Sequence, residues 1–139
     1  MTAAALPRTD ARARAEELIA FLETGEAAPG LFAPGVFVDF TLPRWRLQAR
    51  GRDDALALRR GGHPSAGRVP RSRFDPTSTG FVLELEETWQ DAGGSWYCRE
   101  LFRADVGPEG ITDLAVYCTG DWDDARVAEH AREVTLIHP

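Results

Sequence analysis

Alternating apolar and polar residues predict three long β-strands in the second half of the chain. Apolar side chains recur at every second position within 81–89, 96–104 and 114–118, which is the period of a strand that buries one face. The two connections, Ala92-Gly-Gly-Ser95 and Gly107-Pro-Glu-Gly110, are rich in residues that favour tight turns. We therefore expect an antiparallel meander over residues 80–118.

Shorter elements precede and follow this meander. The predicted order begins with a helix over 10–24, a short segment over 26–33 with room for one or two helical turns, a β-hairpin over 36–49, a short helix over 53–62 and a strand over 68–74. The meander follows, then a helix over 124–132 that Asp123 caps, and a segment over 134–137 that is either a final strand or an extended tail. Helices and strands that occur in separate runs indicate an α+β fold. We expect one domain over 1–139, with residues 1–8 as a flexible tail and 123–139 as a C-terminal helix and tail.

Two carboxylates interrupt the apolar face of the meander. Glu87 lies on its first strand and Glu100 on its second. A two-residue turn at Gly93-Gly94 places them directly opposite each other, whereas a four-residue loop makes them diagonal neighbours; both keep them on the apolar face. Two carboxyl groups in a partly apolar site cannot both ionise cheaply, so we expect one raised pKa and a neutral acid beside an ionised base. The alternative is that Glu87, near the strand end, simply reaches water.

Apolar residues on the same face are candidates for the wall of a substrate pocket. The second turn, interpreted as a three-residue loop, places Cys118 on this face and points Tyr117 away from it. The predicted substrate-binding residues of the meander are Leu85, Trp89, Trp96, Phe102 and Val116. Aromatic core packing is the alternative role for the two tryptophans.

Composition and spacing exclude several function classes. A net charge of −6 argues against a nucleic-acid or anionic-membrane partner, because binding phosphates requires a basic surface. The chain contains no apolar run of membrane-spanning length, no histidine pair with metal-ligand spacing and no glycine-rich phosphate loop. We expect a cytoplasmic protein with no metal and no cofactor. Cys98 and Cys118 are then reduced apolar fillers, and His63, in a Gly/Pro-rich loop, is either solvated or part of a pocket lid.

Four local motifs occur in the order of the predicted elements. They are Leu31-Phe32-Ala33, Glu100-Leu-Phe-Arg103, Gly110-Ile-Thr-Asp-Leu114 and Tyr117-Cys-Thr-Gly-Asp-Trp122. With these motifs, its length and its element order, the chain resembles the nuclear transport factor 2-like (NTF2-like) superfamily, which includes SnoaL-like polyketide cyclases and ketosteroid isomerases. The resemblance implies a cystatin-like cone, in which a curved antiparallel sheet wraps around N-terminal helices and encloses a pocket.

The resemblance also implies roles for particular residues. The isomerases carry a pocket acid two residues before a Phe-Arg pair, and Glu100 holds this position before Phe102-Arg103. Their general base falls on Phe40, which we include among the predicted substrate-binding residues. The nearest acid, Asp39, is one residue short, and such a shift points a strand side chain to the opposite face. The first helix offers Phe21 where the isomerases have a phenol, so their mechanism is not carried over whole.

The leading hypothesis is a cofactor-independent SnoaL-like enzyme that binds a small apolar, carbonyl-bearing metabolite. Glu100, with Glu87 or Asp39, would perform acid–base catalysis of an isomerisation, cyclisation or hydration. The alternative is a non-catalytic binding or accessory module of the same fold. Because members of this superfamily commonly pair through the sheet, we also expect a homodimer in which Leu101 and Tyr117 belong to the interface.

Overall fold

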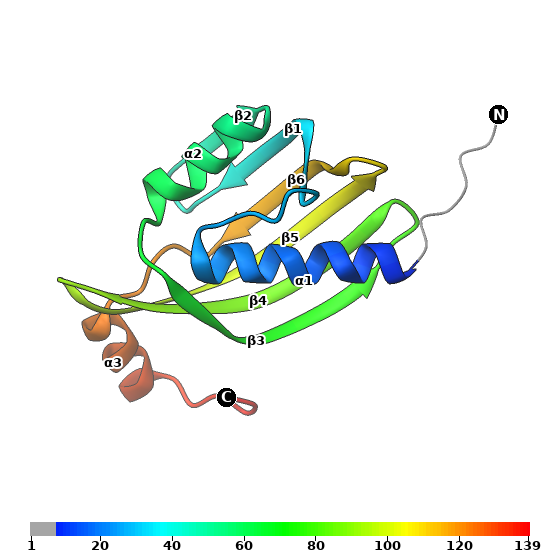
Figure 1. The fold of residues 1–139 in the computed structure, drawn as a ribbon. Helices are drawn as coiled ribbons and strands as arrows, with labels where there is room; N and C mark the ends of the chain where they lie inside the picture. The colour runs from blue at the N-terminus through cyan, green and yellow to red at the C-terminus, as the bar shows by residue number, and fades with distance from the viewer. Residues whose placement is uncertain (1–7) are drawn as a thin grey trace.

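A computed structural model describes residues 8–139, which form one curved six-stranded sheet with three helices (Figure 1). The elements are α1 (Arg8–Thr24), β1 (Phe32–Thr41), β2 (Arg46–Arg50), α2 (Arg52–Gly62), β3 (Gly67–Pro76), β4 (Gly80–Asp91), β5 (Gly94–Gly107), β6 (Gly110–Cys118) and α3 (Asp124–Glu133). Residues 1–7 of the predicted tail lie outside the described residues, and Arg8 begins α1. The α+β fold class is confirmed.

The sheet is mixed, which corrects the prediction of a fully antiparallel one. Its strand order is β2-β1-β6-β5-β4-β3, and every neighbouring pair is antiparallel except β1 and β6, which run parallel. Hairpin connections force sequential strands to be antiparallel. The connection between β1 and β6 spans five other elements and is long enough to permit a parallel crossover.

The turn between β4 and β5 differs by one position from the two-residue turn considered above. Asp91 pairs with Gly94, so the turn residues are Ala92 and Gly93. Gly94 has a φ of 122°, a conformation that glycine adopts without a steric penalty. In this register Trp89 lies opposite Trp96, and their rings stack with centroids 6.5 Å apart, a cross-strand contact that stabilises the pairing.

This register makes the two meander carboxylates diagonal neighbours on one face. Glu87 pairs with Cys98, and Glu100 pairs with Leu85. Both carboxylates are almost fully buried, at 2% and 4% exposure. The alternative that Glu87 reaches water is therefore excluded by its position.

The turn between β5 and β6 contains two residues and is followed by a bulge. Gly107 pairs with Gly110, and the register shifts by one residue next to Asp105. The shift has the same effect on the faces as the predicted three-residue loop, because Phe102 still lies opposite Val116. Tyr117 is 56% exposed on the other face, as the alternation predicts.

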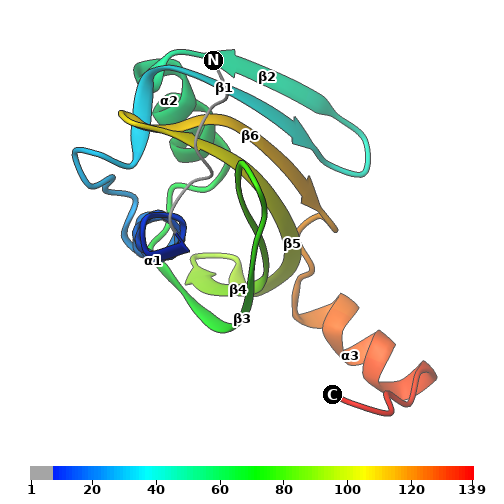
Figure 2. The ribbon, with the colours of Figure 1, turned by 90° about the vertical axis from the view of Figure 1, so that its right-hand side faces the viewer.

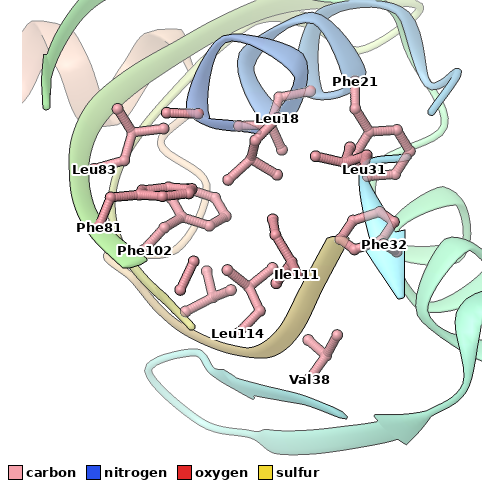
Figure 3. Packing of buried hydrophobic residues seen from close by; sticks show 14 of the residues in the cluster. Leu18, Phe21, Leu31, Phe32, Val38, Phe81, Leu83, Phe102, Ile111 and Leu114 are labelled. Atoms are coloured by element: carbon pink, nitrogen blue, oxygen red, sulfur yellow. The ribbon is translucent and has the colours of Figure 1, made fainter. Parts of the chain in front are cut away.

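The concave face of the sheet curves around α1 and buries the core between them (Figures 1 and 2). Helical spacing places Ala11, Ala15, Leu18 and Leu22 on the buried side of α1. Leu18 points toward aromatic and aliphatic side chains of β4, β5 and β6, whereas Phe21 lies beside Leu31 and packs edge-on against Phe32 of β1 (Figure 3). Toward the α2 end of the sheet, this layer gives way to a cavity.

Helix α3 lies outside the cone and projects from the body (Figure 2). Asp123 caps it as predicted, since its side chain accepts a hydrogen bond of 2.8 Å from the backbone N–H of Arg126. Residues 134–137 form no strand, and Ile137 is 90% exposed. Among residues 8–139, none of the helices has the length and apolar character needed to cross a bilayer.

Candidate functional site

The inside of the cone contains a cavity of about 430 Å³. It lies where the β1–β2 hairpin and α2 extend beyond α1, so strand, helix and loop residues all contribute to its wall. Its apolar lining comprises Leu18, Phe21, Leu22, Phe32, Val38, Phe40, Leu42, Leu47, Ala55, Ala57, Leu58, Phe102, Leu114 and Val116. Its polar side chains are Arg59, His63, Glu87, Cys98, Glu100, Cys118 and Asp121. An apolar cleft with a few convergent polar groups is typical of a small-molecule site.

Five of the nine predicted site residues line this cavity. They are Phe40, Glu87, Glu100, Phe102 and Val116. They converge because the sheet curls, which brings the inward faces of β1, β4, β5 and β6 around one space. The sequence had predicted a shared face only for residues on neighbouring strands of the meander.

Three predicted substrate-binding residues lie elsewhere, which corrects their assignment. Leu85 is 2% exposed and belongs to the hydrophobic core. Trp89 and Trp96 line a second, more open groove between the far end of β4 and β5 and helix α3. Trp89 and Trp96 pair with each other between the turn and the Glu87–Cys98 pair that lines the cavity, so they extend past it.

Asp39 lies on the outer face of β1, so the structure contradicts its prediction as a pocket base. Its neighbours Val38 and Phe40 both line the cavity, and side chains alternate along a strand. The carboxylate accepts hydrogen bonds of 3.0 and 2.7 Å from the Nε and Nη2 atoms of Arg46 on β2. This contact lowers the pKa of Asp39. Asp39 therefore connects the two strands of the hairpin.

A buried ion pair holds Glu87 inside the cavity wall. Arg59 on α2 donates from Nη2 to Oε1 at 2.5 Å and from Nη1 to Oε2 at 3.1 Å, and Nη2 also donates to the carbonyl of Leu22 at 3.0 Å. The side chains are 14% and 3% exposed. Burial by itself would raise the pKa of Glu87, but hydrogen bonds with Glu100 and Arg59 outweigh it and lower this pKa. Glu87 is therefore the ionised member of the carboxylate pair.

Glu100 is the neutral member of the pair. Burial raises its pKa well above the ordinary value, and the adjacent Glu87 carboxylate raises it further. One carboxyl oxygen of Glu87 and one of Glu100 lie within 4.8 Å of each other. The Cys98 thiol donates a weak hydrogen bond to Oε1 of Glu100 at 3.6 Å. At neutral pH the cavity thus presents a carboxylic acid, whose one O–H can donate either to Glu87 or to an oxygen atom of a ligand.

Two cysteines lie beside Glu100. Cys98 is buried, and Cys118 is half-buried and accepts a hydrogen bond of 3.4 Å from the backbone N–H of Gly120. Donor atoms of Cys98, Cys118 and Asp121 lie within 4.8 Å of one another, and so do those of Glu87, Cys98 and Glu100. The hydrogen bond with Cys118 and burial both raise the pKa of Cys98. The same hydrogen bond lowers the pKa of Cys118, and a thiol must lose its proton to bind a metal ion.

Three polar residues of the cavity were missed or misplaced by sequence reasoning: Arg59, His63 and Asp121, of which Asp121 had been noted only as part of the motif over 117–122. Arg59 resembles any charged residue of a surface helix, yet it follows the buried Ala55 by four residues and so shares its face; this spacing was the available signal. His63 was expected in a solvated loop or a lid. It lies in the cavity wall, with its ring 4.0 Å from that of Trp89.

The fold matches those of several known structures. An NTF2-like protein from Anabaena variabilis superposes with a TM-score of 0.69 at 18% identity, covering 81% of this chain and 89% of its own. A proposed polyketide cyclase from Pseudomonas putida gives a TM-score of 0.63 at 14% identity, covering 86% and 96%. A protein with a cystatin-like fold from Xanthomonas campestris gives 0.59 at 13% identity, covering 85% and 95%.

Sequence comparison adds no closer relationship, since no protein-family model and no curated protein matches the chain. Similarity at these identities is similarity of fold. Element order, the curled sheet around α1 and three independent superpositions all agree. The chain therefore has the NTF2-like, cystatin-like fold that its sequence resemblance predicted.

Proposed function

We propose that this protein binds a small apolar, carbonyl-bearing molecule inside the cone and acts on it by acid–base chemistry through Glu100. The observation that carries the proposal is a pair of buried carboxyl groups, Glu87 and Glu100, in the wall of a mostly apolar cavity; burial and the neighbouring carboxylate raise the pKa of Glu100. In such a site a carboxylic acid donates a hydrogen bond to an oxygen atom that gains negative charge during reaction. Isomerisation, cyclisation and hydration of a carbonyl compound can each begin in this way.

The other carboxylates of the cavity receive different roles in this proposal. Both oxygens of Glu87 are engaged by Arg59, so we assign Glu87 a positioning role: its negative charge helps to keep Glu100 protonated. Asp121 lines the same cavity and has no hydrogen bond or ion pair within residues 8–139. We assign it the role of proton acceptor, because a base requires an accessible lone pair.

Binding and proton transfer can be tested with one ketone. 2-Acetylnaphthalene carries a carbonyl group and exchangeable α-hydrogens, and 2-isopropylnaphthalene has nearly the same shape without oxygen. We expect calorimetry to show about tenfold tighter binding of the ketone, which corresponds to one hydrogen bond in a dry site. We also expect the protein to accelerate deuterium exchange of the α-hydrogens, followed by NMR in D₂O.

Variants separate the two roles. Glu100→Leu should abolish the preference for the ketone, while Glu84→Leu, on the exposed face of the same sheet, should retain it. Asp121→Asn should keep the binding preference and lose the accelerated exchange. An equal affinity of wild type for both compounds would disprove the proposal.

A non-catalytic binding module is the second candidate function. The bidentate contact between Arg59 and Glu87 favours it, because this contact occupies the one fully buried ionised carboxylate of the cavity. This candidate predicts Glu100-dependent binding of the ketone without accelerated exchange in the wild-type protein.

We further propose that two copies of the chain associate through the outer face of the sheet. Leu101 and Tyr117 lie directly opposite each other on β5 and β6, and they are 38% and 56% exposed. An apolar pair in the middle of a sheet face suits a contact between copies.

We expect Leu101→Arg to sediment as a monomer and wild type as a dimer. Val127→Arg, on the exposed surface of α3, is the matched control, and an unchanged mass of Leu101→Arg would count against this interface.

A further inference from the structure

His63 carries two hydrogen-bonding atoms for which residues 8–139 supply no partner. It follows α2, and its ring packs against Trp89 at 4.0 Å with an interplanar angle of 62°. Both ring nitrogens are shielded from solvent and make no hydrogen bond with any group among residues 8–139. Leaving a buried polar group unpaired costs free energy, so such groups in native proteins call for an explanation.

The position of this imidazole links it to the candidate site. His63 lines the same cavity as Glu100 and lies near Arg59, Glu87 and Asp121. Burial lowers the pKa of His63, and the nearby Arg59 lowers it further. The ring is therefore neutral at pH 7, and a neutral imidazole offers one N–H donor and one acceptor nitrogen.

We propose that the His63 ring turns a nitrogen from its shielded position into the cavity and there binds a second polar group of the ligand, and that this group is a hydroxyl. The inference rests on the proposed function, in which Glu100 holds the carbonyl oxygen of the same ligand. A hydroxyl group both donates and accepts, so it can pair with either nitrogen of a neutral imidazole. The substrate class is thereby narrowed to neutral hydroxylated carbonyl compounds with an apolar body.

The charges of the cavity argue against an anionic group at this position. Arg59 is the one basic residue of the described lining that is always charged, and Glu87 already engages it through two hydrogen bonds. The remaining ionisable neighbours of His63 include the acidic Asp121. A ligand carboxylate beside His63 would find no free counter-ion and would face like charge.

The test compares 2-acetylnaphthalene with its ring-hydroxylated isomers, titrated by calorimetry into the full chain. We expect at least one isomer to bind wild type about three- to tenfold more tightly than the parent ketone, the gain of one net hydrogen bond. His63→Phe and the smaller His63→Leu should remove this gain and retain binding of the parent ketone. His138→Phe, in the exposed C-terminal tail, is the matched control and should keep the gain. Thermal melting shows which of the two His63 variants is folded. If neither folds, the comparison of the isomers with the parent ketone on wild type still tests the inference.

The outcomes distinguish this inference from the function on which it rests. If no hydroxylated isomer binds wild type more tightly than the parent, or if the gain persists in the folded His63 variants, the inference is overturned. The proposed function still stands in that case, provided that Glu100→Leu removes the preference for the ketone over 2-isopropylnaphthalene. If wild type shows no preference for the ketone, the proposed function fails first. A methyl ester of 2-naphthoic acid and the free acid extend the test: tighter binding of the free acid would overturn the exclusion of anionic ligands.

Discussion

Replacing Arg59 with methionine is expected to lower the free energy of unfolding by about 3–5 kcal/mol. The substitution keeps a long apolar stem but leaves the Glu87 carboxylate without its counter-ion, and that side chain is 3% exposed. Removing one partner of a buried pair is costly, because the remaining charge stays desolvated. Urea unfolding at pH 7, followed by circular dichroism, measures the change.

Two variants identify the cause of this loss. Arg44→Met, the same substitution in the exposed β1–β2 connection, should change the free energy of unfolding by less than about 0.5 kcal/mol. Adding Glu87→Gln to Arg59→Met should recover much of the stability, because no buried charge then remains. A cost of Arg59→Met no larger than that of Arg44→Met would show that the ion pair does not stabilise the fold.

Replacing Glu100 with glutamine is expected to stabilise the protein, by an amount that grows as the pH rises. In the folded state burial raises the pKa of Glu100 well above 4.5, its ordinary value, which it regains on unfolding. Between these two pKa values the folded state binds one proton more than the unfolded state. Wild type therefore loses up to about 1.4 kcal/mol of stability per pH unit across this window. Glutamine is neutral at every pH and removes this loss.

The pKa shift of the partner carboxylate, Glu87, has the opposite sign, and it affects stability in a separate pH range. The pKa of Glu87 is lowered in the folded state, so its contribution to stability is present above 4.5 and is lost as the pH falls through its folded pKa. Unfolding curves of wild type and Glu100→Gln from about pH 5 to about pH 8 thus isolate the effect of Glu100. Glu84→Gln, on the exposed face of β4, should differ from wild type by less than about 0.5 kcal/mol at each pH. Parallel curves for wild type and Glu100→Gln would mean that Glu100 is ionised in the folded protein.

Local periodicity accounts for the parts of the fold that the sequence predicted. Alternation identified the inward face of the meander, and it placed Glu87 and Glu100 on that face before any register was known. The prediction was robust because a strand has a period of two: the turn at Ala92-Gly93 and the bulge near Asp105 moved the pairing without changing the faces. The same rule explains why Asp39, which we had kept as a candidate base, lies outside the cavity: its neighbours Val38 and Phe40 both point inward.

The missing parts of the site come from elements that are distant along the chain. Arg59 reaches Glu87 from α2, 28 residues earlier, and only its spacing of four residues from Ala55 separates it from a solvated arginine such as Arg60. Trp89 and Trp96 have the alternation of pocket residues, but they lie beyond the end of the cavity. Where the cone closes depends on how α1 and α2 pack against the sheet.

By itself the sequence determined the element types, the inward faces of the strands and which two carboxyl groups, Glu87 and Glu100, are buried. It could do so because periodicity and turn chemistry act between near neighbours. Tertiary structure alone decided which carboxyl group is ionised and which is neutral. Glu87 and Glu100 are chemically equivalent along the chain, and they differ because α2 brings a guanidinium group to one of them and apolar packing surrounds the other. Both pKa values depend on burial and on charges a few ångströms away, and these exist only once the sheet has curled around its helices.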